Sequence, residues 1–528
     1  MATATVSAWA PLRIPMFRAL YLAQFVSNCG TFMQLVGAQW LMGDLGGTTL
    51  QVSLVQTATS LPVFLFVLPS GALGDILDRR RLLIASQLWM LVAAGALSAL
   101  TFTDAMTPGL LLALTFAIGV GTALTIPSFQ AVMPELVGRA LIPQGAALNG
   151  VNFNVARAVG PAFGGALIAA AGPGWVFAIN AISFLGTMTV LAVWRREPPP
   201  RAFGVEHVWA AVGAGARFVR SAPALRTVLV RAALFMPFAG AMWALLPVLA
   251  RDQLELDSGG YGLLLGAVGV GAFAGAFVLP RLRAQLSLDT VVGGSALTFA
   301  AATAAAGTIH VVAVVVVALV LAGIAWIGVL SSLNASAQKL LPDWARARGL
   351  AYYTLTFQGG QALGAVVWGV IAHAAGVEWA FVTSAAGVAL GVLVGVRARL
   401  LSRDLDLRPA GEWSEPHLVI EPRPDSGPVL VVVEWHVPPE RHAEFRVAMQ
   451  PVERARRRSG ARRWGLYCDG EDASRFIEAY TVATWEEHVR QMQRVTVRDR
   501  ELEQAARDLV TPGTEPTLRR FFGAGRHG

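Results

Sequence analysis

Long apolar segments alternate with short polar stretches from near the start of the chain to about residue 400. A helix needs roughly 20 apolar residues to cross the hydrocarbon core of a membrane. Lipid offers the backbone of such a segment no hydrogen-bond partner, so the segment must be helical. The pattern predicts twelve membrane-spanning helices, at residues 16–42, 50–73, 82–103, 108–133, 144–171, 174–194, 226–250, 259–281, 286–308, 311–337, 348–374 and 378–398.

The loops between these segments differ in charge in a regular way. Every second loop is rich in arginine, such as the loop with Arg79, Arg80 and Arg81, whereas the intervening loops carry mainly acidic residues such as Asp44 and Glu378. Positively charged loops remain on the cytoplasmic side of a membrane. The pattern therefore predicts a multi-pass protein of the cytoplasmic (inner) cell membrane, with both termini in the cytoplasm.

The composition fits a chain that is largely surrounded by lipid. The 528 residues are 55% hydrophobic and 14% charged, whereas a soluble domain has roughly 25% charged residues. The arginine-rich loops account for the formal net charge of +8, so we expect membrane lipid as a partner and no nucleic acid. Cys29 and Cys468 are interpreted as free thiols, and we expect no metal site and no cofactor.

The two halves of the apolar region resemble each other. The sequence Phe-Val-Leu-Pro at residues 66–69 recurs at residues 277–280, and a Gly-x-x-Trp spacing that begins at Gly172 recurs at Gly376. Six spans per half give both halves the same orientation, which is a parallel repeat about an axis along the membrane normal. The predicted domains are a six-helix half at 1–197, a cytoplasmic central loop at 198–225, a second six-helix half at 226–403, a linker at 404–428 and a cytoplasmic domain at 429–528.

The loop after the second predicted helix carries a cluster of charges, in the segment GALGDILDRRR that begins at Gly71. Together with twelve helices in a parallel repeat, this loop resembles the signature of the major facilitator superfamily of transporters. The resemblance implies a cytoplasmic gate or latch formed by Gly71, Asp75, Asp78, Arg79 and Arg80. The alternative interpretation is a charge cluster that only orients the chain in the membrane.

A glycine- and proline-rich segment, RAVGPAFGG, lies in the fifth predicted helix. Small residues allow membrane helices to approach one another closely. The segment resembles a motif of exporters in the superfamily. The resemblance implies a role in the transport path or in coupling for Arg157, Gly160, Pro161, Gly164 and Gly165, while ordinary close packing of helices is the alternative.

Two further segments, Ser27–Gln34 and Ile126–Leu136, resemble the enterobactin-exporter-like, or transmembrane secretion effector, branch of the superfamily. The resemblance covers about residues 12–400. It implies a secondary active transporter that exports a small organic compound, a drug or a secreted metabolite, by alternating access. Uptake by the same fold is an alternative.

The superfamily lines its central cavity mainly with the first, fourth, seventh and tenth helices. In this chain these helices offer neutral polar or broad apolar side chains, which suit an amphiphilic organic molecule. Each of them can equally serve as a contact between helices. These candidate cavity residues are Asn28, Gln34, Gln130, Met236, Trp243 and Asn334.

Ionisable groups within a membrane are costly and mark functional positions. Arg157 lies in the middle of a predicted span, whereas Arg231 lies near the start of its span, from which its side chain can extend to the interface. No aspartate or glutamate lies clearly within a predicted span. Proton coupling is therefore implied by the resemblance alone, and uncoupled or potential-driven export remains open.

The residues after 428 follow the pattern of a soluble domain. Strands are predicted at 429–437, 462–468, 476–484 and 517–522, with helices at 439–459 and 485–509. This order, βαββαβ, is ferredoxin-like, and the domain is similar to the dimeric α+β barrel of antibiotic-biosynthesis-type monooxygenases. The predicted fold class is therefore an all-α polytopic membrane protein with a small C-terminal α+β domain.

The histidines of this domain show neither nucleophile–base spacing nor metal-ligand spacing. His488 is predicted to lie on an amphipathic helix with a solvated basic face. We expect a regulatory, ligand-sensing or dimerising domain, with a homodimer as one outcome, and no enzyme. The alternative is a membrane-anchored enzyme or sensor whose active part is this domain.

Overall fold

The computed structural model describes residues 7, 9–138, 141–195, 208–401, 405–411, 418–419 and 422–523. The chain forms two compact units. The first, here called the helical unit, comprises Met1–Val208, Val228–Ala335 and Ala351–Leu400. The second, here called the tail unit, comprises Trp209–Thr227, Ser336–Leu350 and Leu401–Gly528.

The first half of the helical unit contains six long helices after a 3₁₀ turn at Ala10–Arg13. They are α1 (Pro15–Asp44), α2 (Thr49–Ile76), α3 (Arg79–Phe102), α4 (Pro108–Val137), α5 (Ile142–Ala171) and α6 (Pro173–Val193).

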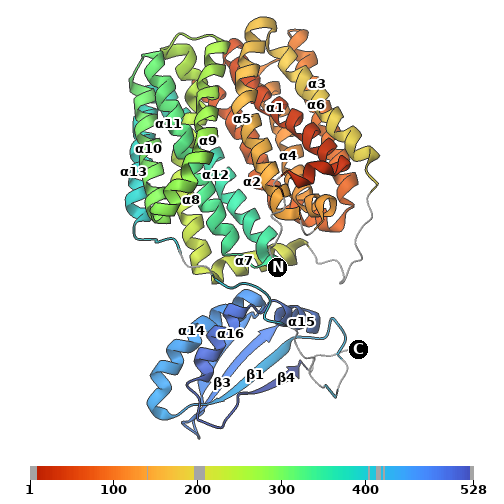
Figure 1. Ribbon diagram of the computed structural model, residues 1–528, viewed down its shortest axis with the longest axis vertical. Coiled ribbons are helices and arrows are strands. Elements are labelled where there is room, and N and C mark those ends of the chain that lie inside the picture. The colour runs from red at the N-terminus through yellow and green to blue at the C-terminus, as the bar shows by residue number, and fades with distance from the viewer. Residues whose placement is uncertain are drawn as a thin grey trace. The chain divides into compact units, whose positions relative to one another are not determined.

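The second half repeats this arrangement, and its helices form a second group beside the first (Figure 1). A π-helical turn at Leu249–Gln253 extends the first of them. They are α8 (Pro223–Val248), α9 (Ser258–Gln285), α10 (Leu288–Thr308), α11 (Val312–Lys339), α12 (Asp343–Ala375) and α13 (Val377–Gly395).

Eleven helices within the described residues are long and apolar enough to cross a membrane. The helix α1 is 30 residues long but does not belong to this set. Several amides, among them Gln24, Asn28, Gln34 and Gln39, lower its hydropathy. The structure therefore shows a mostly helical polytopic fold with eleven candidate spans.

Equivalent glycines end equivalent helices in the two halves. Gly172 between α5 and α6 has φ of 87°, and Gly376 between α12 and α13 has φ of 96°. This left-handed backbone conformation is one that glycine adopts without a steric penalty. The repeat of Gly-x-x-Trp in the sequence thus corresponds to the same tight turn in both halves.

The tail unit contains an antiparallel sheet. Its strands are β1 (Val429–His436), β2 (Arg463–Cys468), β3 (Arg475–Val482) and β4 (Thr517–Phe522), in the order β2-β3-β1-β4. One face of β1 is buried, with Val429, Val431, Val433 and Trp435 each at most 4% exposed. Phe445 and Met449 of α14 (His442–Ser459) pack on part of this face.

The tail helices differ from the sequence-based prediction in one respect. The single helix predicted at 485–509 is two helices, α15 (Trp485–Gln493) and α16 (Val497–Arg507). The helix is interrupted there because Thr496 starts a new helix by a reciprocal capping box with Asp499. A further helix, α7 (Val208–Ser221), lies in the predicted central loop, where no helix was expected.

Candidate functional site

The predicted cytoplasmic latch lies where α2 is followed by α3. Asp78 caps α3 by accepting a hydrogen bond from the backbone N–H of Arg81 at 2.9 Å. Arg79 forms an ion pair with Glu135 of α4 at 3.0 Å, and Arg80 donates to the carbonyl oxygen of Leu191 in α6 at 2.7 Å. These contacts join the start of α3 to two other helices of the same half. Gly71 and Asp75 belong to α2, but their side-chain environment lies outside the described residues.

A second set of contacts joins the two halves near the end of α1, at the opposite end of α2 from the predicted latch. Asp44, the last residue of α1, forms an ion pair with Arg251 at 2.9 Å. Gln39 donates to the carbonyl oxygen of Trp243 in α8 at 3.0 Å and accepts a hydrogen bond from the hydroxyl of Tyr261 in α9 at 2.5 Å. This layer was not predicted from the sequence, because its members are far apart along the chain.

The glycine- and proline-rich segment of α5 lies between α1 and α9. A Cβ atom added at Gly160 would lie 2.8 Å from Cβ of Phe32, and one added at Gly164 would lie 3.0 Å from Cα of Met33. On the α9 side, a Cβ atom at Gly165 would lie 2.8 Å from Cα of Gly262. The backbones of α5 and α9 therefore touch with no side chain between them, and this contact joins the two halves.

Arg157 lies near the middle of α5 and faces two tryptophans of the second half. Its guanidinium carbon is 4.4 Å from the ring centroid of Trp243 in α8 and 5.3 Å from that of Trp326 in α11. The two indole rings are 5.2 Å apart and nearly edge to face. Trp243 was a predicted cavity residue, whereas Trp326 was not singled out from the sequence.

The other predicted cavity residues are divided between helix contacts and more open positions. Asn28 donates to Asn152 of α5 at 2.9 Å. Gln34 is buried and accepts a hydrogen bond from Asn180 of α6. Met236 is fully buried, Asn334 is half-buried and Gln130 is exposed.

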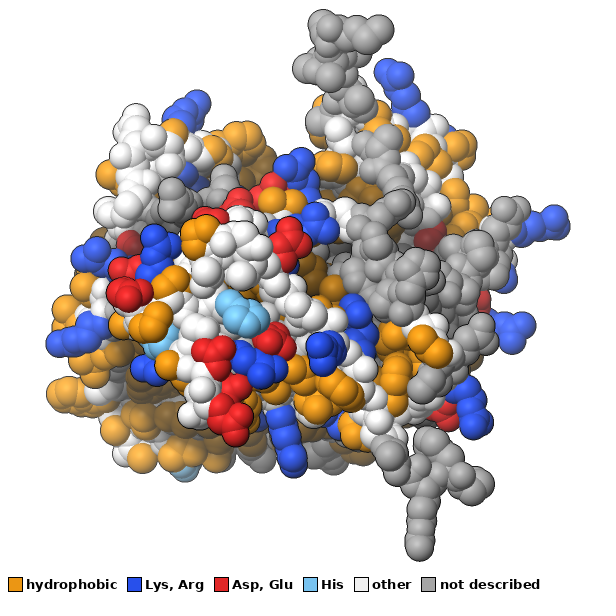
Figure 2. All heavy atoms as spheres, turned by 90° about the horizontal axis from the view of Figure 1, so that it is seen from below, with side chains coloured by type: hydrophobic (Ala, Val, Ile, Leu, Met, Phe, Trp, Pro, Cys, Tyr) orange, Lys and Arg blue, Asp and Glu red, His pale blue; other side chains and the backbone are white. Residues whose placement is uncertain are grey.

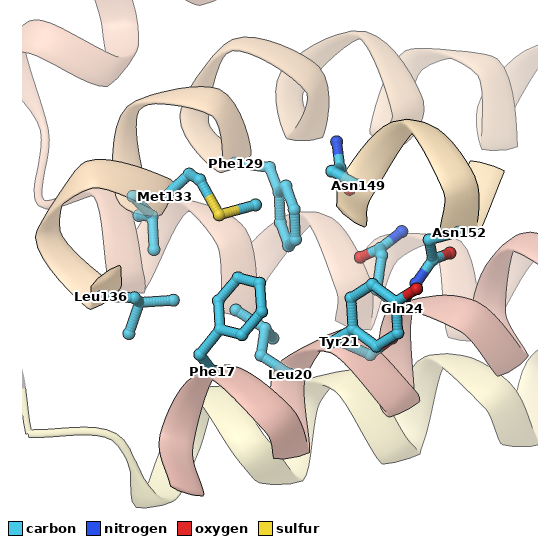
Figure 3. Close-up of a pocket in the computed structure, with 10 residues that line it drawn as sticks. Phe17, Leu20, Tyr21, Gln24, Phe129, Met133, Leu136, Asn149 and Asn152 are labelled. Atoms are coloured by element: carbon cyan, nitrogen blue, oxygen red, sulfur yellow. Dashed lines mark hydrogen bonds between the residues drawn. The ribbon is translucent and has the colours of Figure 1, made fainter. Parts of the chain in front are cut away.

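A small pocket lies within the first half, between α1, α4 and α5 (Figure 3). Phe17, Met133 and Leu136 form its apolar end, and Gln24 and Asn152 lie at its polar end (Figure 3). The pocket therefore has an amphiphilic lining, with Asn28 hydrogen-bonded to the amides at the polar end.

Arg231 is buried and has an anionic partner. It forms an ion pair with Asp289 at 2.5 Å and donates to the carbonyl oxygens of Ala398 and Gly395. Asp289 lies at the start of α10. The pair could not be predicted from the sequence, because its two residues are far apart along the chain. Arg231 thus joins α8 to α10 and to the end of α13.

The tail unit holds a second pocket, of about 280 Å³, between α14 and the strands β2 and β3. Arg446, Glu453, Trp464 and Phe476 are among the residues that line it. Within the described residues, no group of three or more histidine, cysteine, aspartate or glutamate side chains could hold a metal ion.

Ion pairs occur both at the surface and in the interior of the tail unit. Arg475 contacts Glu434 at 2.9 Å, and Arg456 bridges Glu478 at 3.1 Å and Glu503 at 3.0 Å. The face shown in Figure 2 carries intermixed acidic and basic side chains. His488 lies on the buried side of its helix and is 0% exposed. Burial and the Arg520 charge lower its pKa to about 4.

Solved structures share the architecture of the helical unit. The nucleoside transporter NupG aligns with a TM-score of 0.58 at 12% identity, covering 72% of this chain and 98% of that one. A bacterial homologue of the lysosomal transporter Spinster aligns with a TM-score of 0.59 at 15% identity, covering 74% and 98%. Two six-helix halves that meet along α5 and α9 define a membrane transporter fold of the major facilitator type.

The chain belongs to the transmembrane secretion effector family, whose sequence profile matches residues 6–527. The multidrug efflux pump Tap of Mycolicibacterium fortuitum is 27% identical over 417 residues, covering 76% of this chain and 98% of Tap. The enterobactin exporter EntS of Escherichia coli is 26% identical over 387 residues, covering 72% of this chain and 90% of EntS. The predicted assignment to this branch is confirmed.

Proposed function

We propose that the protein exports a small organic compound, a drug or a secreted metabolite, across the cytoplasmic membrane. The observation that carries the proposal is the α5 segment that resembles the exporter motif and packs directly against α9 of the other half. The similarity to Tap and EntS supports export over uptake. Transport would proceed by alternating access, with the two halves moving about a site near the middle of the membrane.

We infer that α1 is a twelfth span. It is 30 residues long and packs along α5 and α6, which are both apolar enough to cross a membrane. Twelve spans would place both termini in the cytoplasm, in agreement with the arginine-rich loops. The domain boundaries at 197, 225, 403 and 428 remain part of this proposal.

The latch residues would act on the cytoplasmic side. Arg79 and Arg80 hold the start of α3 to α4 and α6, which makes the loop a rigid part of its half. Asp75 would then contact the other half in the outward-facing state. Replacing Asp75 by Asn is expected to reduce efflux at normal expression, and unchanged efflux would contradict the latch.

An efflux assay tests the proposal as a whole. Cells that express the protein are loaded with a panel of drugs and dyes, and efflux is measured with and without a protonophore. Export that collapses with the protonophore supports proton coupling, whereas export that persists supports uncoupled or potential-driven movement. If no compound leaves faster than from cells with the empty vector, the exporter proposal is wrong.

For the tail we propose a ferredoxin-like domain related to the antibiotic-biosynthesis-type α+β barrels. The strand order and the βαββ start of the domain support it. The face of the sheet opposite α14 carries Leu430, Val432, Ile477 and Phe521, of which Phe521 is 48% exposed. We propose that this face forms a homodimer contact. The Phe521→Glu variant is expected to lower the mass of the purified full chain in light scattering, and an unchanged mass would contradict the contact.

Removal of the tail separates the transporter from the alternative of a membrane-anchored enzyme or sensor. A chain that ends at Arg403 is expected to retain efflux, with its rate or its response to substrate altered. Complete loss of efflux with normal membrane insertion would instead make the tail essential for the activity.

A further inference from the structure

Arg157 differs in its partners from Arg231, which is buried, and from Arg283, which is half-buried. Arg231 is neutralised by Asp289, and Arg283 donates to the hydroxyls of Ser331 and Ser332 at 2.5 and 2.9 Å. Within the described part of the chain, Arg157 has neither an ion pair nor a hydrogen bond, and its contacts are the two indole rings. A charge without a counter-ion in a membrane is costly, so such a position is expected to serve a ligand.

The two tryptophans add a second, independent observation. The indole N–H groups of Trp243 and Trp326 are both buried and, among the described residues, have no hydrogen-bond acceptor. Trp326 is 0% exposed. A buried donor without an acceptor costs about 1–3 kcal/mol, and here two of them lie beside a cation that is itself only a donor.

The cluster thus concentrates donors and positive charge and offers no acceptor. A guanidinium and two indole N–H groups match an oxyanion, because a planar carboxylate accepts two hydrogen bonds from one guanidinium. The aromatic rings of Phe235, Phe299 and Phe357, which surround Trp326, make the surroundings apolar. A low dielectric constant strengthens the attraction between Arg157 and an anion.

We propose that Arg157, Trp243 and Trp326 bind an acidic group of the transported molecule, such as a carboxylate, sulfonate or phenolate on an aromatic frame. The proposal rests on the proposed export function and names its substrate class as organic anions. Arg157 belongs to the first half, and both tryptophans belong to the second. An anion bound here contacts both halves, so its affinity depends on how the halves are arranged.

Two dyes with the same xanthene frame test the charge preference. Fluorescein is anionic and rhodamine 6G is cationic, and binding of each to the purified full chain is measured by fluorescence polarisation. We expect fluorescein to bind more tightly. Arg157→Gln is expected to weaken fluorescein binding by about tenfold or more, because a charge-assisted hydrogen bond is lost, and Arg157→Lys by less.

The tryptophans are tested by substitutions that keep the ring and remove the donor. Trp243→Phe and Trp326→Phe are each expected to weaken fluorescein binding several-fold, and to weaken it more than they weaken rhodamine 6G binding. The matched control is Trp379→Phe, since Trp379 lies in α13 and is 62% exposed. A fluorescein affinity that does not change in Arg157→Gln overturns the anion site, as does tighter binding of rhodamine 6G.

Efflux of the same dyes separates this proposal from the export function. Export of rhodamine 6G without export or binding of fluorescein would leave the exporter in place and overturn the anion site. Binding of fluorescein that depends on Arg157, without export of either dye, would support the site and count against the export function. Loss of fluorescein export in Arg157→Gln, with normal expression, supports both.

Discussion

Two arginines within the long helices show how residues of one type acquire different roles. Arg157 could be placed in the middle of a span from the sequence, because its distance from both ends of the apolar segment is visible there. Its tryptophan neighbours could not be predicted, since Trp243 and Trp326 come from helices of the other half. Arg231 was interpreted as extending to the interface, whereas the structure pairs it with Asp289.

The pair of Arg231 and Asp289 is expected to stabilise the helical unit. The side chain of Arg231 is 9% exposed, so Asp289→Asn leaves a buried charge without its counter-ion. We expect a loss of about 2–3 kcal/mol, at or just below the range of about 3–5 kcal/mol for breaking a buried pair, because the Asp289 side chain is 32% exposed. Thermal unfolding of the purified protein measures this change.

The matched control for this pair is Arg251 with Asp44, whose side chains are 41% and 40% exposed. Asp44→Asn is expected to cost at most about 1 kcal/mol, because solvent screens an exposed pair. Equal losses in the two variants would show that burial does not distinguish the pairs.

His488 makes the stability of the tail depend on pH. Its Nε2 accepts a hydrogen bond from Arg520 at 3.0 Å, and burial, together with the charges of Arg520 and Arg456, disfavours a second proton. The folded pKa of about 4 lies below the ordinary value of 6.5. The unfolded chain therefore takes up the proton more readily. The free energy of unfolding of the tail is undiminished by His488 above pH 6.5 and falls as the pH drops from 6.5 towards 4.

The full shift corresponds to about 3 kcal/mol. Limited proteolysis of the full-length protein at pH 7.5 and pH 5 should show faster cleavage of the tail at the lower pH. His488→Gln should reduce this difference, because glutamine does not titrate. An equal pH response in the variant would assign the effect to other groups.

Among the elements, the long apolar helices were predictable and the short polar ones were not. Twenty or more apolar residues leave one structural solution in lipid, so every long helix of the helical unit coincides with a predicted span to within a few residues at most ends. The break between α15 and α16 depends on one capping box at Thr496, which a helical pattern of apolar residues does not reveal. The helix α7 was missed because it falls in a loop defined by its proline residues and charges.

The contact between α5 and α9 is expected to be sensitive to a single methyl group. A Cβ atom at Gly165 would lie 2.5 Å from the carbonyl oxygen of Ser258, and real Cβ atoms do not approach so closely. Gly165→Ala should therefore push the helices apart and reduce efflux severalfold, with a loss of stability of about 1–3 kcal/mol from overpacking.

Gly186→Ala provides the control, because nothing lies within 4 Å of a Cβ atom there. This substitution should leave stability unchanged or slightly raised, since alanine favours the helix. Normal efflux and stability in Gly165→Ala would show that the close contact is not required.

At the scale of the whole helical unit, the parallel repeat could be inferred from short sequence matches, and the contacts between the halves could not. The matches at residues 66–69 and 277–280 lie in equivalent helices, α2 and α9. The contact between α5 and α9 at Gly165 and Gly262, here called the seam, depends on which faces of two distant helices meet. A glycine in the sequence does not specify which helix it will contact. The relative positions of the candidate gate, the seam and Arg157 are therefore known only from the structure.

The seam between α5 and α9 also has a mechanical consequence. A contact made by two backbones can act as a pivot, at which the halves rotate while the separation stays nearly constant. Ala162 lies there, with its Cβ atom 3.4 Å from a Cβ atom built at Gly266, close to the spacing of a disulfide. In a variant with both native cysteines changed to serine, Ala162→Cys with Gly266→Cys should allow oxidation to link the halves and still permit export. A longer thiol-reactive cross-linker between cysteines placed at positions 44 and 251, where the halves meet through the tip of the long Arg251 side chain, should stop export.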